Sequence, residues 1–300
     1  MLPNFLIVGA AKSGTTSLYR YLQQHPDIFM SQKKEPKFFS SQFLKFPFVG
    51  PGDQNMELSI CKTFDKYESL FKYADNIKAV GEASADNLYY YTHAIPLIKK
   101  YLGNVKILII LRNPIDRAFS SYNHLVRDNR EELSFEEAFE KSSERKNNNW
   151  EFIWHYKDVG FYFRQVEAYL NNFKSIKIVL YEDLRDDAPT LIKDLYRFLE
   201  VDPSFEPDVT RKYNFSGNPK NKLLHSFWVR GNLVKTLTKS ALRIFIEEEK
   251  LDAFRDRMFA ANLMKNQMNP STRNYLRELY REDILKLQTI IKRDLSKWLA

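Results

Sequence analysis

Short apolar runs alternate with helical patterns through the first two thirds of the chain. Apolar side chains dominate residues 5–11, 105–111 and 176–181. Each run is far shorter than the roughly 18 residues of a membrane span and has the length of a buried β-strand. A stretch with apolar residues at helical spacing follows each run. This alternation predicts an α/β fold in which helices cover both faces of a central parallel sheet.

Local signals place the predicted helices along the chain. Leu18, Tyr21 and Leu22 lie on one face of a helix over residues 15–24. Pro114 and Pro189 stand in the first turns of helices that extend to about residues 127 and 199. A further helix over 162–173 precedes the third strand, and a short strand is expected around 79–81.

The last part of the chain, beyond residue 214, has a mostly helical pattern. Ser271 is the predicted N-cap of a final helix pair that ends near Trp298. No internal repeat and no linker interrupts the sequence. We therefore predict a single domain over residues 1–300, with a helical C-terminal extension from about residue 226.

Composition agrees with a soluble, globular protein. Of the 300 residues, 44% are hydrophobic and 28% are charged, a balance that supports a sizeable core. The single cysteine, Cys61, cannot form an intrachain disulfide, which favours a reducing compartment. The first strand begins with no basic leader before it and no transmembrane segment follows, so we expect a cytoplasmic location.

Positive charge is concentrated in one segment. The net charge is +8, and residues 211–246 contain eight Lys or Arg and no Asp or Glu, so the rest of the chain sums to zero. This excess indicates either an anionic partner near the segment or a solvated basic face. No nucleic-acid recognition motif accompanies it, and we predict no nucleic-acid partner.

The loop after the first strand has the composition of a phosphate-binding site. Gly9 and Gly14 have the G-x-x-x-x-G spacing, and the loop leads into a helix N-terminus, where free N–H groups and the helix dipole favour an anion. A Walker A loop needs lysine directly after the second glycine, but Thr15 stands there and the lysine is Lys12. This difference separates the loop from that of a P-loop kinase.

A second anion site is predicted where the 105–111 strand ends. A Walker B strand ends in an Asp that helps to hold magnesium, whereas this strand is followed by Arg112. Ser120 lies two helical turns further along. An arginine fork with a nearby hydroxyl suits a second phosphate, and it neutralises the anion without a metal. Because the chain also lacks a His or Cys cluster, we predict no metal requirement.

With both motifs present in order, the chain resembles the sulfotransferases that use PAPS (3'-phosphoadenosine 5'-phosphosulfate) as sulfate donor. The strings KEPKFF at 34–39, GEAS at 81–84 and YEDL at 181–184 are closer to the bacterial and heparan-sulfate branch than to the cytosolic steroid and phenol branch. The resemblance implies a P-loop-like three-layer fold. It also implies a donor site made of Lys12, Ser13, Gly14, Thr15, Thr16 and Ser17 around the 5'-phosphosulfate, Arg112 and Ser120 around the 3'-phosphate, and Lys220 and Lys222 in a late basic loop.

The resemblance also suggests the groups that carry the chemistry. Lys12 becomes the partner of the leaving group, and Glu35 becomes the base that takes the proton of the acceptor. Neighbouring lysines lower the pKa of Glu35 and weaken it as a base, and Glu82 is the alternative.

The sequence thus predicts a sulfotransferase that moves the sulfuryl group of PAPS to a hydroxyl or amine of a small-molecule or glycan acceptor and releases PAP, the 3',5'-bisphosphate. Two alternatives stay open. The chain could be a non-catalytic nucleotide- or polyanion-binding module, or a P-loop kinase. The sequence does not identify the acceptor.

Overall fold

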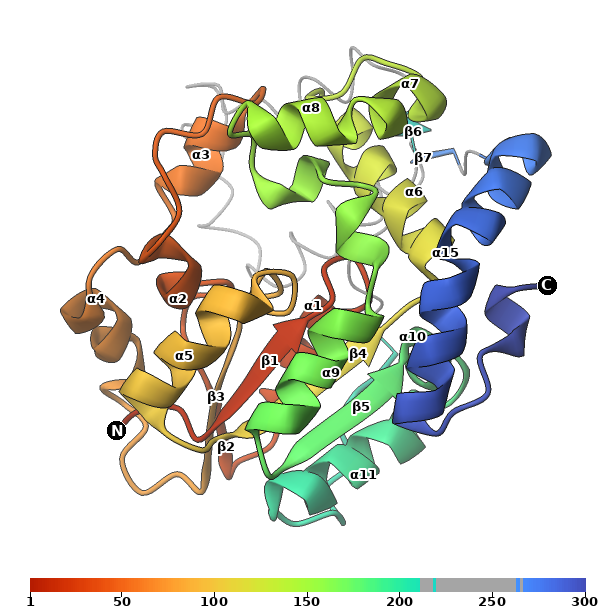
Figure 1. Ribbon diagram of the computed structural model, residues 1–300. Coiled ribbons are helices and arrows are strands. Elements are labelled where there is room, and N and C mark those ends of the chain that lie inside the picture. Colours follow the sequence, from red (N-terminus) through yellow and green to blue (C-terminus); the bar gives the residue numbers. More distant parts are fainter. Residues whose placement is uncertain (211–217, 220–262, 265–266) are drawn as a thin grey trace, which may run out of the picture.

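The computed structural model describes residues 1–210, 218–219, 263–264 and 267–300. Its centre is a five-stranded sheet with the order β2-β3-β1-β4-β5, and every neighbouring pair is parallel (Figure 1). The strands are β1 (Phe5–Gly9), β2 (Ile28–Met30), β3 (Ala79–Ala83), β4 (Lys106–Leu111) and β5 (Ile176–Leu180). The predicted α/β class with a parallel sheet is therefore confirmed.

Strand β1 shows why both faces of the sheet are covered. Leu6 and Val8 point to one face, where they join a core built with α5, α6, α9 and α15. Phe5 and Ile7 point to the other face and pack with α1 and α11. The covering helices are α1 (Thr15–Leu22), α5 (Tyr91–Leu102), α6 (Pro114–Arg127), α9 (Phe163–Asn172), α11 (Ala188–Leu199) and α15 (Pro270–Ile291).

Short helices fill the connections around the carboxyl ends of the strands. They are α2 (Phe38–Ser41), α3 (Asp53–Glu57), α4 (Phe64–Glu68), α7 (Phe135–Glu140), α8 (Ser142–Asn147) and α10 (Tyr181–Asp186). A second, two-stranded sheet pairs β6 (Asn218–Pro219) with β7 (Leu263–Met264) in antiparallel fashion. These connections surround the end of the sheet where the predicted phosphate motifs lie.

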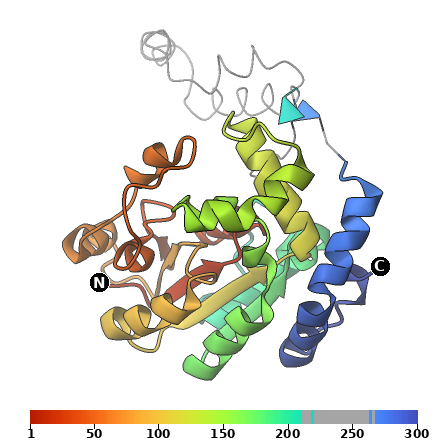
Figure 2. The same ribbon diagram turned by 45° about the horizontal axis from the view of Figure 1, so that its top comes forward.

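The C-terminal helix α15 lies against α6 and α9 (Figures 1 and 2). Asp283 accepts hydrogen bonds from the backbone N–H groups of Tyr162, at 2.7 Å, and of Phe163, and so it satisfies free donors at the start of α9. Beyond α15, Trp298 joins two strand ends. Its carbonyl accepts from Asn113 at 3.3 Å, and its indole N–H donates to Glu182 at 3.0 Å.

Two local expectations need correction. The N-cap of the last helix is Asn269, whose side chain accepts from the N–H of Ser271, because Pro270 already occupies the first helical position. A 22-residue helix followed by a short 3-10 turn at Ser296–Trp298 replaces the expected helix pair.

Strand β2 was not predicted, since its three residues are too few for a periodic signal. Residues 226–262 of the expected extension lie outside the described residues.

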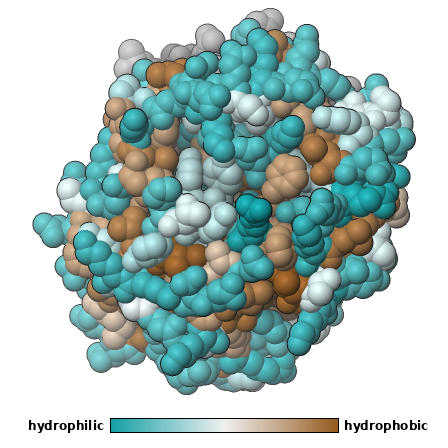
Figure 3. Space-filling model, in the orientation of Figure 1, coloured by the Kyte–Doolittle hydropathy of each residue, from teal (hydrophilic) through white to brown (hydrophobic). Residues whose placement is uncertain are grey.

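Hydrophilic side chains cover most of the face seen in Figure 3, and the hydrophobic ones are scattered among them. Within the described ranges, no helix has the length and apolar character needed to cross a membrane.

Candidate active site

A cavity of about 600 Å³ opens at the carboxyl ends of the parallel strands. Its lining residues follow four different strands: Lys12 comes after β1, Glu35 after β2, Arg112 after β4 and Tyr181 after β5. This is the edge at which open parallel sheets bind their ligands. The sheet thus brings together side chains that are far apart in the sequence.

The glycine-containing loop forms one wall of the cavity and leads directly into α1. Gly14 is the N-cap of α1 and has φ of 103°, a left-handed conformation that favours glycine. A Cβ atom at this position would lie 2.8 Å from Cδ2 of Leu184, so that side chain would have to shift, but the backbone conformation is the main reason for glycine. Thr15, Thr16 and Ser17 line the cavity from the first turn of the helix, where backbone N–H groups are free to bind an anion.

Lys12 lies in this loop with φ of 65°, a strained conformation for a residue with a side chain. Within the described residues its ammonium group makes no ion pair. Burial, reinforced by the positive charge of Arg127, lowers the pKa of Lys12 to about 7. An anion bound beside Lys12 would restore its charge, which makes the lysine a sensitive anion-binding group.

Arg112 fastens the loop to the end of β4. Its Nη1 donates to the carbonyl of Lys12 at 3.1 Å, and its guanidinium lies 4.7 Å from the centre of the Tyr181 ring. Ser120 lies on α6, the helix that follows Arg112, as predicted. Its side chain also lines the cavity. The structure therefore brings Lys12, Arg112 and Ser120 into one cavity, as the two motifs predict.

Glu35 faces the same cavity, and it too has a left-handed backbone, with φ of 60°. Its carboxylate lies 2.8 Å from Nζ of Lys34 and 3.8 Å from Nζ of Lys37. Although burial acts to raise it, Lys34, Lys37 and Lys12 together lower the pKa of Glu35 to about 2. The carboxylate is thus ionised at every physiological pH.

Lys37 is a buried cation held by carboxylates. Its Nζ lies 2.7 Å from Oε1 of Glu151 and 4.8 Å from the centre of the Phe152 ring. Burial alone would lower the pKa of Lys37, but Glu151, Asp86 and Glu35 outweigh it and keep that pKa above the ordinary value. Lys37 therefore stays charged, and its ammonium group lies between the carboxylates of Glu151 and Glu35.

Glu82, the alternative base, lies elsewhere. It is fully buried on β3, outside the lining of the cavity, and its Oε2 accepts from the hydroxyl of Ser84 at 2.8 Å. Burial raises the pKa of Glu82 to about 8, so the group is mostly protonated at neutral pH. The Ser84 hydroxyl in turn accepts from the backbone N–H of Lys37 at 3.0 Å. Glu82 supports the turn that carries Lys37 and does not reach the cavity.

Sequence reasoning missed several lining residues. His124 lies one helical turn after Ser120, and this spacing was a signal that could have revealed it. Its Nδ1 lies 2.6 Å from Nη2 of Arg127, a donor, so the ring proton is on Nε2. Burial and then the charges of Lys12 and Arg127 hold the pKa of His124 well below its ordinary value. The imidazole is therefore neutral.

The cavity wall that contains Arg130 and Glu151 is held by the carboxylate of Asp53, which no sequence motif predicted. Asp53 is fully buried and accepts from the N–H groups of Gly50 and Glu151, both at 3.0 Å, and from the indole of Trp154 at 2.9 Å. It also forms an ion pair with Arg130, which lines the cavity. One side chain thus joins three segments that are distant in the sequence.

Three predicted donor-site residues are not placed in the cavity. Ser13 is fully buried and points below the loop toward Tyr162, so its hydroxyl does not line the cavity. Its small size lets the turn pack against the core. Lys220 and Lys222 lie outside the described residues.

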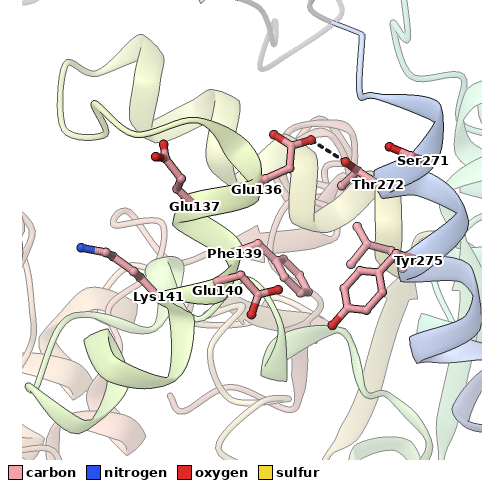
Figure 4. A pocket seen from close by; sticks show the side chains of 9 residues that line it. Glu136, Glu137, Phe139, Glu140, Lys141, Ser271, Thr272 and Tyr275 are labelled. Atoms are coloured by element: carbon pink, nitrogen blue, oxygen red, sulfur yellow. Dashed lines mark hydrogen bonds between the residues drawn. The ribbon is translucent and has the colours of Figure 1, made fainter.

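A second cavity, also of about 600 Å³, lies between α7 and α15 (Figure 4). Phe139 and Tyr275 face each other across it, and Thr272 donates a hydrogen bond to Glu136 at its edge. Glu136, Glu137 and Glu140 give it an acidic rim with Lys141 as the cation among its lining residues. Such a rim repels phosphate, so the cavity at the sheet edge is the better candidate for an anionic ligand.

Among the residues that the structure describes, no group of three or more His, Cys, Asp or Glu side chains is arranged to hold a metal ion.

Comparison with known proteins decides the family. The sequence profile of the sulfotransferase domain matches residues 2–288. The chain belongs to the sulfotransferase family. A crystal structure of a sulfotransferase from Alicyclobacillus acidocaldarius is 36% identical, covers 100% of both chains and has a TM-score of 0.78. The predicted fold, family and enzyme class are thereby confirmed, and the P-loop kinase alternative is set aside.

Two curated sulfotransferases are more distant. The membrane-associated sulfotransferase kil1 of Dictyostelium discoideum is 24% identical over 76% of this chain, and the bifunctional heparan sulfate N-deacetylase/N-sulfotransferase 4 of Mus musculus is 25% identical over 99%. The matches span 62% and 31% of those proteins, respectively. The likeness to bacterial and heparan-sulfate sulfotransferases agrees with the expected branch.

Proposed function

We propose that this sulfotransferase moves the sulfuryl group of PAPS to a hydroxyl, or an amine, of a small-molecule or glycan acceptor. The observation that carries the proposal is the arrangement of one cavity. One end is formed by a helix N-terminus and a loop whose lysine makes no ion pair with the described residues, and the ionised carboxylate of Glu35 faces the same space. These are the groups that an anionic leaving group and an acceptor proton require.

The residues of the loop, together with Arg112 after β4 and Ser120 on α6, fit a bisphosphorylated donor. Lys12 with Gly14, Thr15, Thr16 and Ser17 would hold the 5'-phosphosulfate, and Arg112 with Ser120 would hold the 3'-phosphate. Ser13 would contribute its backbone, since its hydroxyl points away. Lys220 and Lys222 remain candidates for the 3'-phosphate on the sequence pattern alone.

Transfer breaks the bond between sulfur and the 5'-phosphate oxygen and forms a bond between sulfur and the acceptor oxygen or nitrogen. Lys12 would stabilise the charge that develops on the leaving phosphate. Glu35 would accept the proton that the acceptor loses, leaving PAP and the sulfated product. No metal is needed in this scheme, because cationic side chains and N–H groups supply the compensating charge.

The low pKa of Glu35 shapes this role. A carboxylate with a pKa near 2 is a weak base for an unactivated hydroxyl, but the acceptor oxygen becomes acidic as its bond to sulfur forms. Lys34 and Lys37 hold the carboxylate in place. Glu35 therefore acts late in the transfer, by orienting the acceptor and then taking its proton.

The acceptor end of the cavity favours a neutral reacting group. Its cations are already paired, Lys37 with Glu151 and Arg130 with Asp53. Met56, Phe152 and Ile153 add apolar surface to the wall. A hydroxyl on a ring or chain suits this end better than an isolated anion.

The test is acceptor-dependent release of PAP from PAPS, measured across glycans, phenols, alkaloids and lipid alcohols, with and without EDTA. We expect at least one acceptor class to be sulfated, with a rate that EDTA leaves unchanged. Binding of PAP with no turnover on any acceptor would favour a non-catalytic nucleotide-binding module. Loss of turnover on chelation would contradict the metal-free scheme.

We also propose that residues 1–300 form a single domain and that the protein is cytoplasmic. Hydrogen bonds from the C-terminal residues Asp283 and Trp298 to the start of α9 and to the segments after β4 and β5 support a single domain. The single cysteine supports a cytoplasmic location. Limited proteolysis that released a stable fragment ending before α15 would contradict the single domain. Recovery of the protein from a secreted or membrane fraction would contradict the location.

A further inference from the structure

Glu151 is a cavity-lining carboxylate that neither phosphate motif contains. Its backbone N–H donates to Asp53 at 3.0 Å, and its Oε2 accepts from the backbone N–H of Ile153 at 3.0 Å. The side chain is only 5% exposed. The other oxygen, Oε1, accepts from Nζ of Lys37 at 2.7 Å. Because its backbone and both oxygens are engaged, Glu151 is a fixed anchor for the lysine.

The ammonium group of Lys37 faces two carboxylates at unequal distances. Its Nζ lies 2.7 Å from Oε1 of Glu151 but 3.8 Å from Oε2 of Glu35. The first distance is that of a charge-assisted hydrogen bond, and the second is too long for one. The sulfur of Met56 at 3.4 Å and the ring of Phe152 at 4.8 Å also face Nζ, and neither carries a charge. Glu151 therefore takes the strong hydrogen bond that Glu35 would otherwise receive.

The backbone fixes where the side chains of Glu35 and Lys37 begin. Both residues are left-handed, with φ of 60° and 51°. The N–H of Glu35 donates to the carbonyl of Ala83 at 2.9 Å, and the N–H of Lys37 donates to the hydroxyl of Ser84 at 3.0 Å. Such a conformation persists only where surrounding contacts enforce it. The turn thus gives Lys37 a fixed start, and Glu151 determines where its ammonium group ends.

The two carboxylate oxygens of Glu35 differ as a result. Oε1 accepts a hydrogen bond from Nζ of Lys34 at 2.8 Å. Oε2 accepts none from the part of the chain that the structure describes, and Lys37 lies 3.8 Å from it. A charge-assisted hydrogen bond stabilises the ionised form of a carboxylate and makes its oxygen a poorer proton acceptor. Oε2 is therefore the oxygen suited to take a proton.

From these contacts we propose that Glu151 is a positioning residue that holds the ammonium group of Lys37 away from Oε2 of Glu35. This oxygen then stays able to take the proton that the acceptor oxygen or nitrogen loses as its bond to sulfur forms. The inference rests on the proposed function, because it assumes that Glu35 is the base. Without the charge of Glu151, the buried ammonium group would turn to the other carboxylate with which it forms an ion pair, that of Glu35.

Removing the charge of Glu151 gives the first readout. Glu151→Gln keeps the shape of the side chain and an oxygen for the N–H of Ile153, but it loses the anion that holds Lys37. With an acceptor found in the screen, we expect kcat to fall about tenfold, while KM for PAPS and Kd for PAP stay within about twofold. A crystal structure of the variant should place Nζ of Lys37 about 3 Å from Oε2 of Glu35. Glu140→Gln, at an exposed position outside this cavity, is the control for loss of one negative charge and should keep its kcat.

A second substitution tests whether Glu151 acts through Lys37. Lys37→Gln removes the cation, and we expect it to lower kcat less than about threefold, because Lys34 still holds Oε1 of Glu35. The double variant, Glu151→Gln with Lys37→Gln, should have the kcat of Lys37→Gln alone and a higher kcat than Glu151→Gln. Removal of Lys37 would not relieve the loss if Glu151 only supported the fold of the wall or contacted the acceptor itself.

Two outcomes would overturn the inference. They are an unchanged kcat in Glu151→Gln, and a double variant that is less active than Lys37→Gln by the full factor that Glu151→Gln costs. If Glu151→Gln does not fold, the double variant and Lys37→Gln decide: equal kcat values support the inference, and a lower kcat or an unfolded double variant contradicts it. Failure of the proposed function itself looks different, because the wild type would then show no acceptor-dependent release of PAP, or Glu35→Gln would remain fully active.

Discussion

The two ends of the cavity that we assign to the donor and to the acceptor differ in how their cations are paired. At the acceptor end each lining cation has a carboxylate partner, as in the pairs Lys37–Glu151 and Arg130–Asp53. At the donor end Lys12 and Arg112 have none among the described residues, and only Arg185 at the rim pairs, with Asp186. Unpaired cations mark where an anion belongs, whereas paired cations form a rigid wall.

The largest expected effect comes from breaking a pair at the acceptor end. Glu151→Ala leaves Lys37 charged and buried without its closest partner, which should lower the free energy of unfolding by about 3 to 5 kcal/mol. Denaturant unfolding measures the loss. Glu278→Ala is the matched control, since its pair with Arg281 lies on the surface, where solvent screens it and its loss should change stability very little. Equal losses in both variants would remove the proposed contrast between the two ends.

Lys12 offers the opposite case at the donor end. Lys12→Ala should lower turnover by roughly 100- to 1,000-fold, the effect of removing one preorganised donor to developing charge. Its free energy of unfolding should stay the same or rise, because the ammonium group is partly buried and unpaired. Steady-state kinetics and denaturant unfolding of the same preparation check both points. A destabilised Lys12→Ala variant would show that Lys12 has a structural partner.

Glu82 should affect stability and spare catalysis. Its pKa of about 8 in the folded protein lies above the value near 4.5 of an unfolded chain, so the folded state holds its proton longer. The free energy of unfolding therefore falls as pH rises from about 4.5 through 8. Glu82→Gln cannot ionise, so its free energy of unfolding should stay level across this pH range while that of the wild type falls by roughly a few kcal/mol. Thermal unfolding across this pH range is the measurement, and parallel curves for the two proteins would contradict the assignment.

A smaller effect concerns the pH dependence of donor binding. Because the pKa of Lys12 is about 7, the cation that binds phosphate disappears as pH rises, and the Kd of PAP should increase about tenfold between pH 6.5 and 8.5. Lys12→Arg, which stays charged, should show a flatter dependence and corrects for ionisation of the phosphates themselves. Identical slopes in the two proteins would mean that Lys12 does not titrate near neutral pH.

The same contrast explains what the sequence could predict. The residues proposed to bind the donor occur in two contiguous motifs, each at a joint between a strand and a helix, so residue type, local context and the family resemblance together predicted Lys12, Arg112 and Ser120. The acceptor end is assembled by tertiary pairing: Lys37 and Glu151 are 114 residues apart, and Asp53 meets Trp154 across 101 residues. No local pattern reports such contacts. Ser13 was assigned to the donor site through the resemblance of its loop, but its side chain is fully buried and does not line the cavity.

A single substitution, Glu35→Gln, separates donor binding from acceptor chemistry most directly. Glu35→Gln should keep the Kd of PAP within about twofold of the wild type, because the donor end is intact, while acceptor-dependent PAP release falls by about 100-fold or more. Calorimetry and single-turnover kinetics with an identified acceptor give both numbers. Normal turnover in Glu35→Gln together with an inactive but folded Glu82→Gln would contradict the account and transfer the role of base to Glu82.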